Sequence, residues 1–126
     1  MRDGKYVILC IDDDPDILSF LEIVLESGGY VYAGAASAEE GLREFKQIDP
    51  DLIIVDLMME EVDAGTGFAK ELKVLQNRAP VFLLSSVGDN LNLTTDTTTL
   101  GLAGVFQKPL TKETLIAVLK AKLSES

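Results

Sequence analysis

Carboxylate, hydroxyl and ammonium side chains recur in this chain directly after short apolar runs. The residues concerned are Asp12, Asp13, Asp14, Asp56, Ser85, Ser86 and Lys108. Histidine is absent and there is one cysteine, so any metal bound by this group would have oxygen ligands. Oxygen ligands without imidazole or thiolate favour Mg²⁺, with Mn²⁺ as a substitute, over zinc.

This set of side chains suits phosphoryl transfer. Carboxylates held close together repel one another, and a divalent cation removes that repulsion. Because Mg²⁺ is usually held by one or two carboxylates together with a phosphate, such a site is suited to receive a phosphoryl group. The expected nucleophile is a carboxylate, and Asp56 is the best placed. The Lys108 ammonium and the Ser85 hydroxyl would stabilise charge on the transferring group.

Each of these residues also has an ordinary structural interpretation. Asp14 precedes a proline and is well placed to cap a helix. Asp12 and Asp13 could belong to a solvated loop, Ser85 could simply end a strand, and Lys108 could be a surface lysine. What favours a common site is that polar residues follow four different strands of one expected sheet, because ligands bind beyond the carboxyl ends of parallel strands.

The elements that must position these residues can be predicted from hydrophobic periodicity. Strands are expected over 6–11, 30–35, 52–55, 80–84 and 104–107, and helices over 15–26, 37–46, 68–75 and 111–123. The threonine-rich stretch 89–100 predicts only a short, irregular or mobile helix, because threonine is a poor helix former. Strand–helix alternation predicts a doubly wound α/β fold with a five-stranded parallel sheet, and right-handed crossovers leave only a few strand orders. The order 2-1-3-4-5 of known flavodoxin-like (βα)5 folds is the one expected.

Length and composition limit the function classes. A chain of 126 residues fits one domain, so residues 1–126 are expected to form a single unit. No apolar run approaches the roughly 20 residues that span a bilayer, and no secretion signal is evident, so a cytoplasmic protein is expected. The formal net charge of −10 argues against direct binding to nucleic acid. Cys10 lies in an apolar run and is expected to be buried.

Four blocks of this sequence resemble the receiver domains of bacterial response regulators, and together they extend over nearly the whole chain. Residues 6–18 resemble the opening strand with its acidic pair, and 51–59 resemble the phosphoacceptor block. Residues 81–86 resemble the strand that ends in a switch hydroxyl, and 108–109 resemble the family's lysine–proline pair. The separations between the blocks are also close to the family's usual ones.

The resemblance implies a role for each matching residue. Asp56 would be the phosphorylated residue, and Asp12 and Asp13 the acidic pair, with Asp13 the more direct ligand to the metal. Asp56 and the backbone carbonyl of Met58 would complete the protein ligands. Ser85 would be the switch hydroxyl. Lys108 would contact the phosphoryl group, and the peptide bond between it and Pro109 would be cis, as in the family.

The resemblance also implies partners. A sensor histidine kinase or a histidine phosphotransfer protein would donate the phosphoryl group, and a downstream protein or a fused output domain would respond. The chain would catalyse only its own phosphorylation and dephosphorylation. Direct contact with nucleic acid or with a membrane is not expected, on the separate grounds of the net charge of −10 and of the lack of a long apolar run.

Three departures from the family's pattern fall near the site or its signalling surface. Glu60 stands where proline is common, and the following loop, 61–67, is lengthened by two or three residues. Val105 occupies the usual position of an aromatic switch residue, and Phe106 is expected to face the opposite side of its strand. The threonine-rich residues 94–99 replace an ordinary fourth helix.

Two other functions remain open. A receiver-like interaction module that acts without phosphorylation is slightly favoured by the missing aromatic residue and the unusual fourth helix. The presence of the full set of expected site residues counts against it, namely Asp12, Asp13, Asp56, Ser85 and Lys108. A small Mg²⁺-dependent phosphatase is the third hypothesis. It would need an acid/base carboxylate two residues after the nucleophile, where this chain has Met58, and a substrate cap for which the chain has no room.

Overall fold

The computed structural model describes residues 4–56, 72, 74, 75, 79–85, 103–107 and 110–123. The side chain of Ser85 is not among the described parts. The strands are β1 (Val7–Ile11), β2 (Val31–Ala35), β3 (Leu52–Asp56), β4 (Val81–Ser85) and β5 (Gly104–Gln107). The helices are α1 (Pro15–Ser27), α2 (Ala38–Ile48) and α5 (Lys112–Leu123).

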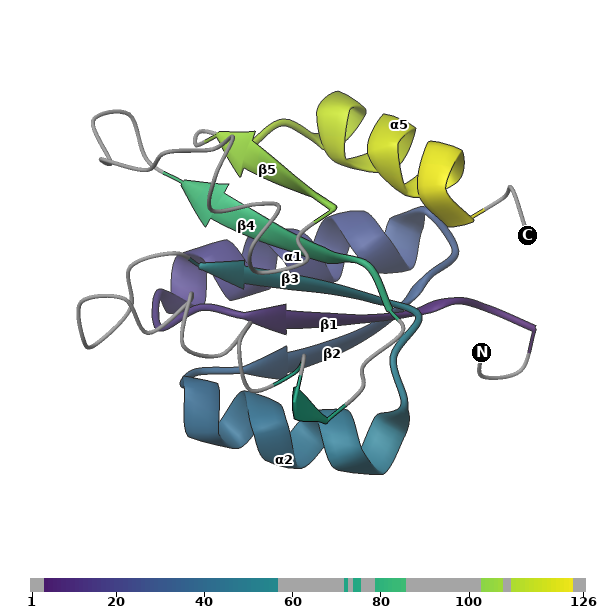
Figure 1. Cartoon of the computed structure of the whole chain (residues 1–126). Coiled ribbons are helices and arrows are strands. Elements are labelled where there is room, and N and C mark those ends of the chain that lie inside the picture. Colours follow the sequence, from purple (N-terminus) through teal and green to yellow (C-terminus); the bar gives the residue numbers. More distant parts are fainter. Residues whose placement is uncertain are drawn as a thin grey trace.

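The strands form one parallel sheet in the order β2-β1-β3-β4-β5, as predicted. All four pairings are parallel, so the carboxyl ends of the strands lie along one edge, on the left of Figure 1. The chain crosses from the edge strand β2 to the interior strand β3 through α2, which is the change of direction typical of a doubly wound sheet.

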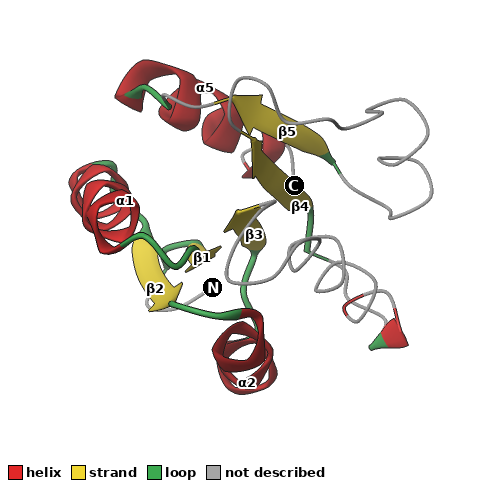
Figure 2. Cartoon of the chain, turned by 90° about the vertical axis from the view of Figure 1, so that its left-hand side faces the viewer, coloured by secondary structure: helices red, strands yellow, loops and turns green. Residues whose placement is uncertain are grey.

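Helices cover both faces of the sheet, with α1 and α5 on one side and α2 on the other (Figure 2). Alternate residues of each strand point to opposite faces, so the apolar runs supply two separate cores. Under α1 and α5, strand residues such as Ile54 and Phe106 pack with Leu25 and Leu119. On the face that α2 covers, Val55 belongs to a second cluster.

Local sequence signals explain where the first two helices begin and end. Asp14 caps α1, accepting a hydrogen bond from the backbone N–H of Asp16, and proline follows at the first helical position. Ser37 caps α2 in the same way, through the N–H of Glu40. Asp49 ends α2 in the left-handed conformation at φ 49°, which aspartate tolerates better than most residues.

The observed bounds correct several predicted ones. Asp56 and Ser85 were expected to follow their strands, but each is the last residue of its strand. Parallel pairing is made by main-chain groups, so the ladder continues through a polar residue where a partner strand is alongside. Helix α2 extends to Ile48, two residues past its predicted end, because Asp49 ends it, and Pro50 follows.

The arrangement of β5 confirms the expected orientation of its aromatic residue. Phe106 is buried in the core beneath α1 and α5 and stacks on Phe82, with ring centroids 5.1 Å apart. Val105 packs against the opposite cluster.

The predictions for 60–67 and 89–100, and most of that for 68–75, concern residues outside the described part. In the part of the chain that the structure describes, no helix is long and apolar enough to cross a membrane.

Candidate functional site

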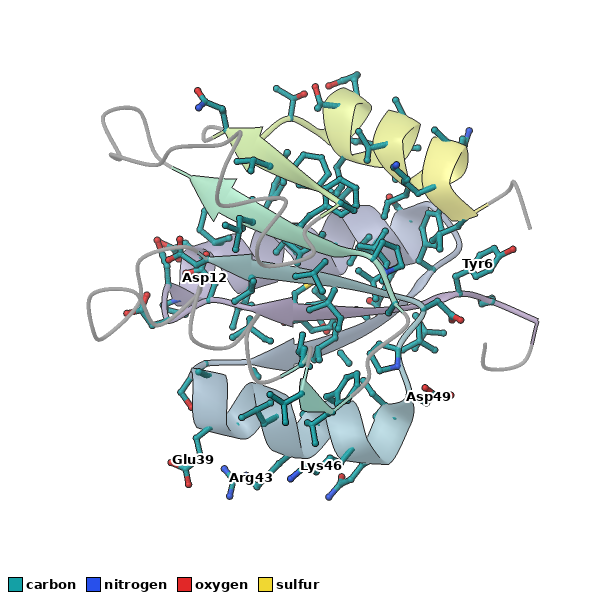
Figure 3. The ribbon with its side chains drawn as sticks, in the orientation of Figure 1. Tyr6, Asp12, Glu39, Arg43, Lys46 and Asp49 are labelled. Carbon is teal, nitrogen blue, oxygen red and sulfur yellow. The ribbon has the colours of Figure 1, made fainter. Side chains whose placement is uncertain are left out.

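Three carboxylates meet at the edge of the sheet where the strands end. Asp12 follows β1, Asp13 is the next residue, and Asp56 ends β3. One oxygen from each of these three side chains lies within 4.8 Å of the other two. Figure 3 shows Asp12 at this edge, in a group of carboxylate oxygens. Sequence reasoning placed these residues at one edge, and the structure brings their side chains together.

Strand pairing explains why Asp12 and Asp56 are neighbours. β1 and β3 lie side by side, with Ile11 opposite Val55, so the next residue of each strand is placed at the same edge. Both aspartates are buried, at 0% and 5% exposure, whereas Asp13 is exposed. The site therefore has two carboxylates fixed in the protein and one that solvent reaches.

A short turn after β1 holds the first carboxylate in place. The backbone N–H of Asp12 donates to the carbonyl oxygen of Ala35 at 3.1 Å, which ties the turn to the edge strand β2. The Oδ1 atom of Asp12 accepts a hydrogen bond from the backbone N–H of Asp14 at 2.9 Å. The side chain of Asp12 is thereby oriented by its own turn.

The negative charge of this edge also acts on the core. Burial raises the pKa of the Cys10 thiol, and the nearby Asp12 carboxylate raises that pKa further. Cys10 is fully buried, as the sequence predicted, and its thiol stays protonated. Asp12 is itself fully buried, two residues from Cys10, so its charge lies close to low-dielectric protein, where like charges repel strongly.

The donor chemistry of the cluster fits a hard divalent cation. Three carboxylate oxygens this close together carry a repulsion that one Mg²⁺ would offset. Mg²⁺ prefers oxygen ligands and usually keeps several waters, and solvent reaches this cluster at the exposed Asp13. The residues present therefore fit the metal that the sequence predicts.

The other predicted site residues are placed only in part. Ser85 ends β4, its main chain is paired with Gln107, and the preceding Leu84 lies opposite Asp56. The main chain therefore brings Ser85 to the same edge as Asp56, one strand away. Met58 and the Lys108–Pro109 pair lie outside the described residues, so their predicted roles stay predictions.

The structure adds one residue that the sequence assigned only to a helix cap. The backbone N–H of Asp14 contacts Asp12, and its side chain caps α1, so Asp14 links the acidic turn to the helix. The only sequence signal for this link was the run of three aspartates before a proline, and that run fits a simple helix cap equally well.

Comparison with known proteins shows the family. The response regulator receiver domain matches residues 8–120, so the chain belongs to this family of signalling switches. A transcriptional regulatory protein of Escherichia coli, GlrR, is 34% identical over 119 residues, which are 94% of this chain and 26% of that protein. The probable transcriptional regulator ycf27 of Guillardia theta is 33% identical over 96% of this chain and 46% of its own length.

A solved structure is similar over its full length. The chemotaxis protein CheY4 of Vibrio cholerae superposes with a TM-score of 0.86 and 25% identity, over 95% of this chain and 100% of that one. The chain spans only about a quarter to a half of the two transcriptional regulators. Because these relatives are named as transcriptional regulators, the comparisons do not support the expectation that the protein makes no contact with nucleic acid.

Proposed function

We propose that this chain is a phosphoacceptor switch of a two-component system, in which Asp56 receives a phosphoryl group in a Mg²⁺-dependent reaction. The observation that carries the proposal is the cluster of Asp12, Asp13 and Asp56, with three carboxylate oxygens within 4.8 Å at the carboxyl edge of the sheet. Asp56 is 5% exposed, so its carboxylate is accessible only over a small area. Membership of the receiver family supports the same reaction.

The donor would be a phosphohistidine of a sensor kinase or of a phosphotransfer protein. A carboxylate oxygen of Asp56 attacks the phosphorus atom, and the P–N bond of the phosphohistidine breaks. The electron pair of that bond stays on the imidazole nitrogen, which takes up a proton, and an acyl phosphate forms on Asp56. Mg²⁺, when bound, would neutralise charge on the phosphoryl oxygens.

The remaining residues are assigned supporting roles in this proposal. Asp12, Asp13, Asp56 and the Met58 carbonyl would hold Mg²⁺ or Mn²⁺. Lys108 and the Ser85 hydroxyl would stabilise charge on the phosphoryl group. Residues 1–126 would act as one receiver unit, which shifts between two states on phosphorylation. A downstream protein or a fused output domain would bind one of these states better.

Intact mass spectrometry tests the proposal directly. The protein is incubated with Mg²⁺ and acetyl phosphate or phosphoramidate, and a single phosphoryl adduct is expected. The adduct should be absent without Mg²⁺ and absent in Asp56→Asn, because the amide is not a comparable nucleophile. Asp49→Asn is the matched control. Asp49 caps the C-terminal end of α2, on the side of the molecule away from Asp12, and Asn also tolerates its left-handed backbone.

A phosphorylation-independent interaction module is the second candidate. It is favoured by the valine at position 105, and by Phe106, which is buried beneath the helices and stacked on Phe82. This candidate predicts that Asp56→Asn leaves partner binding unchanged. If the parent forms no adduct and binds beryllofluoride no better with Mg²⁺ than without it, the phosphoacceptor proposal is wrong and this module replaces it.

A further inference from the structure

Asp14 connects the candidate metal site to the start of α1. Its backbone N–H donates to Oδ1 of Asp12 at 2.9 Å. Its own Oδ1 accepts from the backbone N–H of Asp16 at 2.9 Å, and its carbonyl oxygen accepts from the N–H of Leu18 at 3.2 Å. The residue is therefore held by a hydrogen bond to the acidic turn and by two from the helix.

Asp13 is the residue that most needs such support. It is exposed, so packing does not fix its position, yet its carboxylate reaches within 4.8 Å of the oxygens of two buried aspartates. On one side, the N–H of Asp12 is bonded to β2 through the carbonyl of Ala35. On the other side, Asp14 is anchored to α1. The orientation of Asp13 therefore depends on a turn that is fixed at both ends.

We propose that Asp14 is a positioning residue for the metal. It is not among the clustered ligands, and it acts by capping α1 so that the 12–14 turn presents Asp13 towards Asp12 and Asp56. The inference rests on the proposed function, because it assumes that the cluster binds Mg²⁺. Ligands held by a hydrogen-bonded outer group bind metal more tightly than ligands on a loose turn, since less order must be imposed on binding.

Variants at position 14 can separate the effect of the helix cap on Mg²⁺ binding from the effect of the negative charge. Asp14→Ala removes both the cap and the negative charge. Asp14→Asn removes the charge but keeps a side-chain oxygen that caps about as well as aspartate. Ser37→Ala is the matched control, because it removes the same kind of cap from α2, on the opposite face of the sheet. Mg²⁺ affinity is measured for the full chain by amide NMR titration, with no phosphodonor present.

We expect Mg²⁺ affinity to be reduced in the variant without a cap and kept in the variant that retains one. Asp14→Ala keeps the backbone N–H that bonds Asp12 and loses only the cap, so it should weaken Mg²⁺ binding about 10-fold, the low end of the losses seen when outer groups are removed. Asp14→Asn and Ser37→Ala should bind like the parent. If Asp14→Ala does not stay folded, Asp14→Gly replaces it, because glycine is a tolerated cap that lacks the side-chain oxygen. The same weakening is expected from it.

Two results would overturn the inference without touching the proposed function. If the variant that lacks the cap binds Mg²⁺ as tightly as the parent, the 12–14 turn does not need the cap to hold Asp13 in place. Equal weakening in Asp14→Asn would show that Asp14 acts by its charge and not by position. A parent that binds no Mg²⁺, with amide shifts unchanged in the titration, would overturn the metal site and this inference together.

Discussion

At the scale of single residues, the main feature is that folding forces three negative charges together. Asp12 and Asp56 are buried at the ends of neighbouring strands, and the turn after β1 adds Asp13. Two unit charges 4 Å apart repel by about 1 kcal/mol in water and by more near a protein surface. Without a cation, the cluster should therefore oppose folding.

Asp13→Asn tests this repulsion. Asp13 is exposed, so the amide removes one charge without disturbing the core. In chelator at low salt, the free energy of unfolding should increase by about 1 kcal/mol or more, because two repulsive pairs are lost. Urea unfolding followed by circular dichroism measures the change.

An acid outside the cluster provides the control for that measurement. Glu39 lies in the first turn of α2, where a negative charge interacts favourably with the helix dipole (Figure 3). Glu39→Gln should therefore leave stability unchanged or slightly lower it. If Asp13→Asn is no more stable than the parent without metal, the carboxylates are not repelling one another in the folded protein.

At the scale of elements, the edge strand β2 contains a close approach between two of its own residues. The ring and hydroxyl of Tyr32 lie over Gly34, and a Cβ atom at Gly34 would overlap the Tyr32 hydroxyl oxygen. Burial raises the pKa of Tyr32 to about 12, with further contributions from Cys10 and Glu22. Gly34 thus allows the ring to lie along the strand and cover the sheet.

Gly34→Ala should displace this ring. Overpacking of this kind destabilises a protein by about 1–3 kcal/mol. The displaced Tyr32 should become more exposed, so its pKa should fall from about 12 towards its ordinary value of 10.0. Absorbance at 295 nm, titrated from neutral to alkaline pH, measures this change. An unaltered titration in the variant would show that the contact with Gly34 does not set the pKa.

The raised pKa of Tyr32 also predicts a pH dependence of stability. The folded state favours the protonated phenol, so the contribution of this group is complete below pH 10. It is lost as pH rises from 10 through about 12, where the folded protein also releases the proton. Tyr32→Phe should remove this part of the alkaline loss, and an equally steep loss in that variant would exclude Tyr32 as its source.

The elements also show how much of the fold and site follows from sequence alone. Apolar runs predicted all five strands, because a buried parallel strand must be apolar on both faces. The strand order came from known doubly wound folds and not from the runs themselves, and the structure confirms it. The ends of β3 and β4 were missed by one residue, since main-chain pairing does not depend on whether Asp56 or Ser85 is polar. The helix cap that Asp14 forms was predicted and is confirmed, but the hydrogen bond from its backbone N–H to Asp12 was not predicted, because it depends on backbone angles that residue types do not specify.

At the scale of the whole molecule, a net charge of −10 surrounds two apolar cores. Buried strand and helix residues hold the fold together, while the surface charge opposes it by long-range repulsion. This repulsion is reduced by any dissolved salt. The repulsion inside the carboxylate cluster is different, because a cation bound between the three oxygens, as proposed, would relieve it specifically.

Thermal unfolding in matched salts separates the two effects. Raising NaCl from 10 to 100 mM shortens the screening length from about 30 Å to about 10 Å, so Tm should rise. MgCl2 at equal ionic strength should raise Tm further, since a ligand at 100 times its Kd adds about 2.7 kcal/mol to folding stability. Asp13→Asn should keep the response to NaCl and lose most of the additional response to Mg²⁺. Equal Tm values for the parent in the two salts would mean that Mg²⁺ acts only by screening, and that Asp12, Asp13 and Asp56 do not form a metal site.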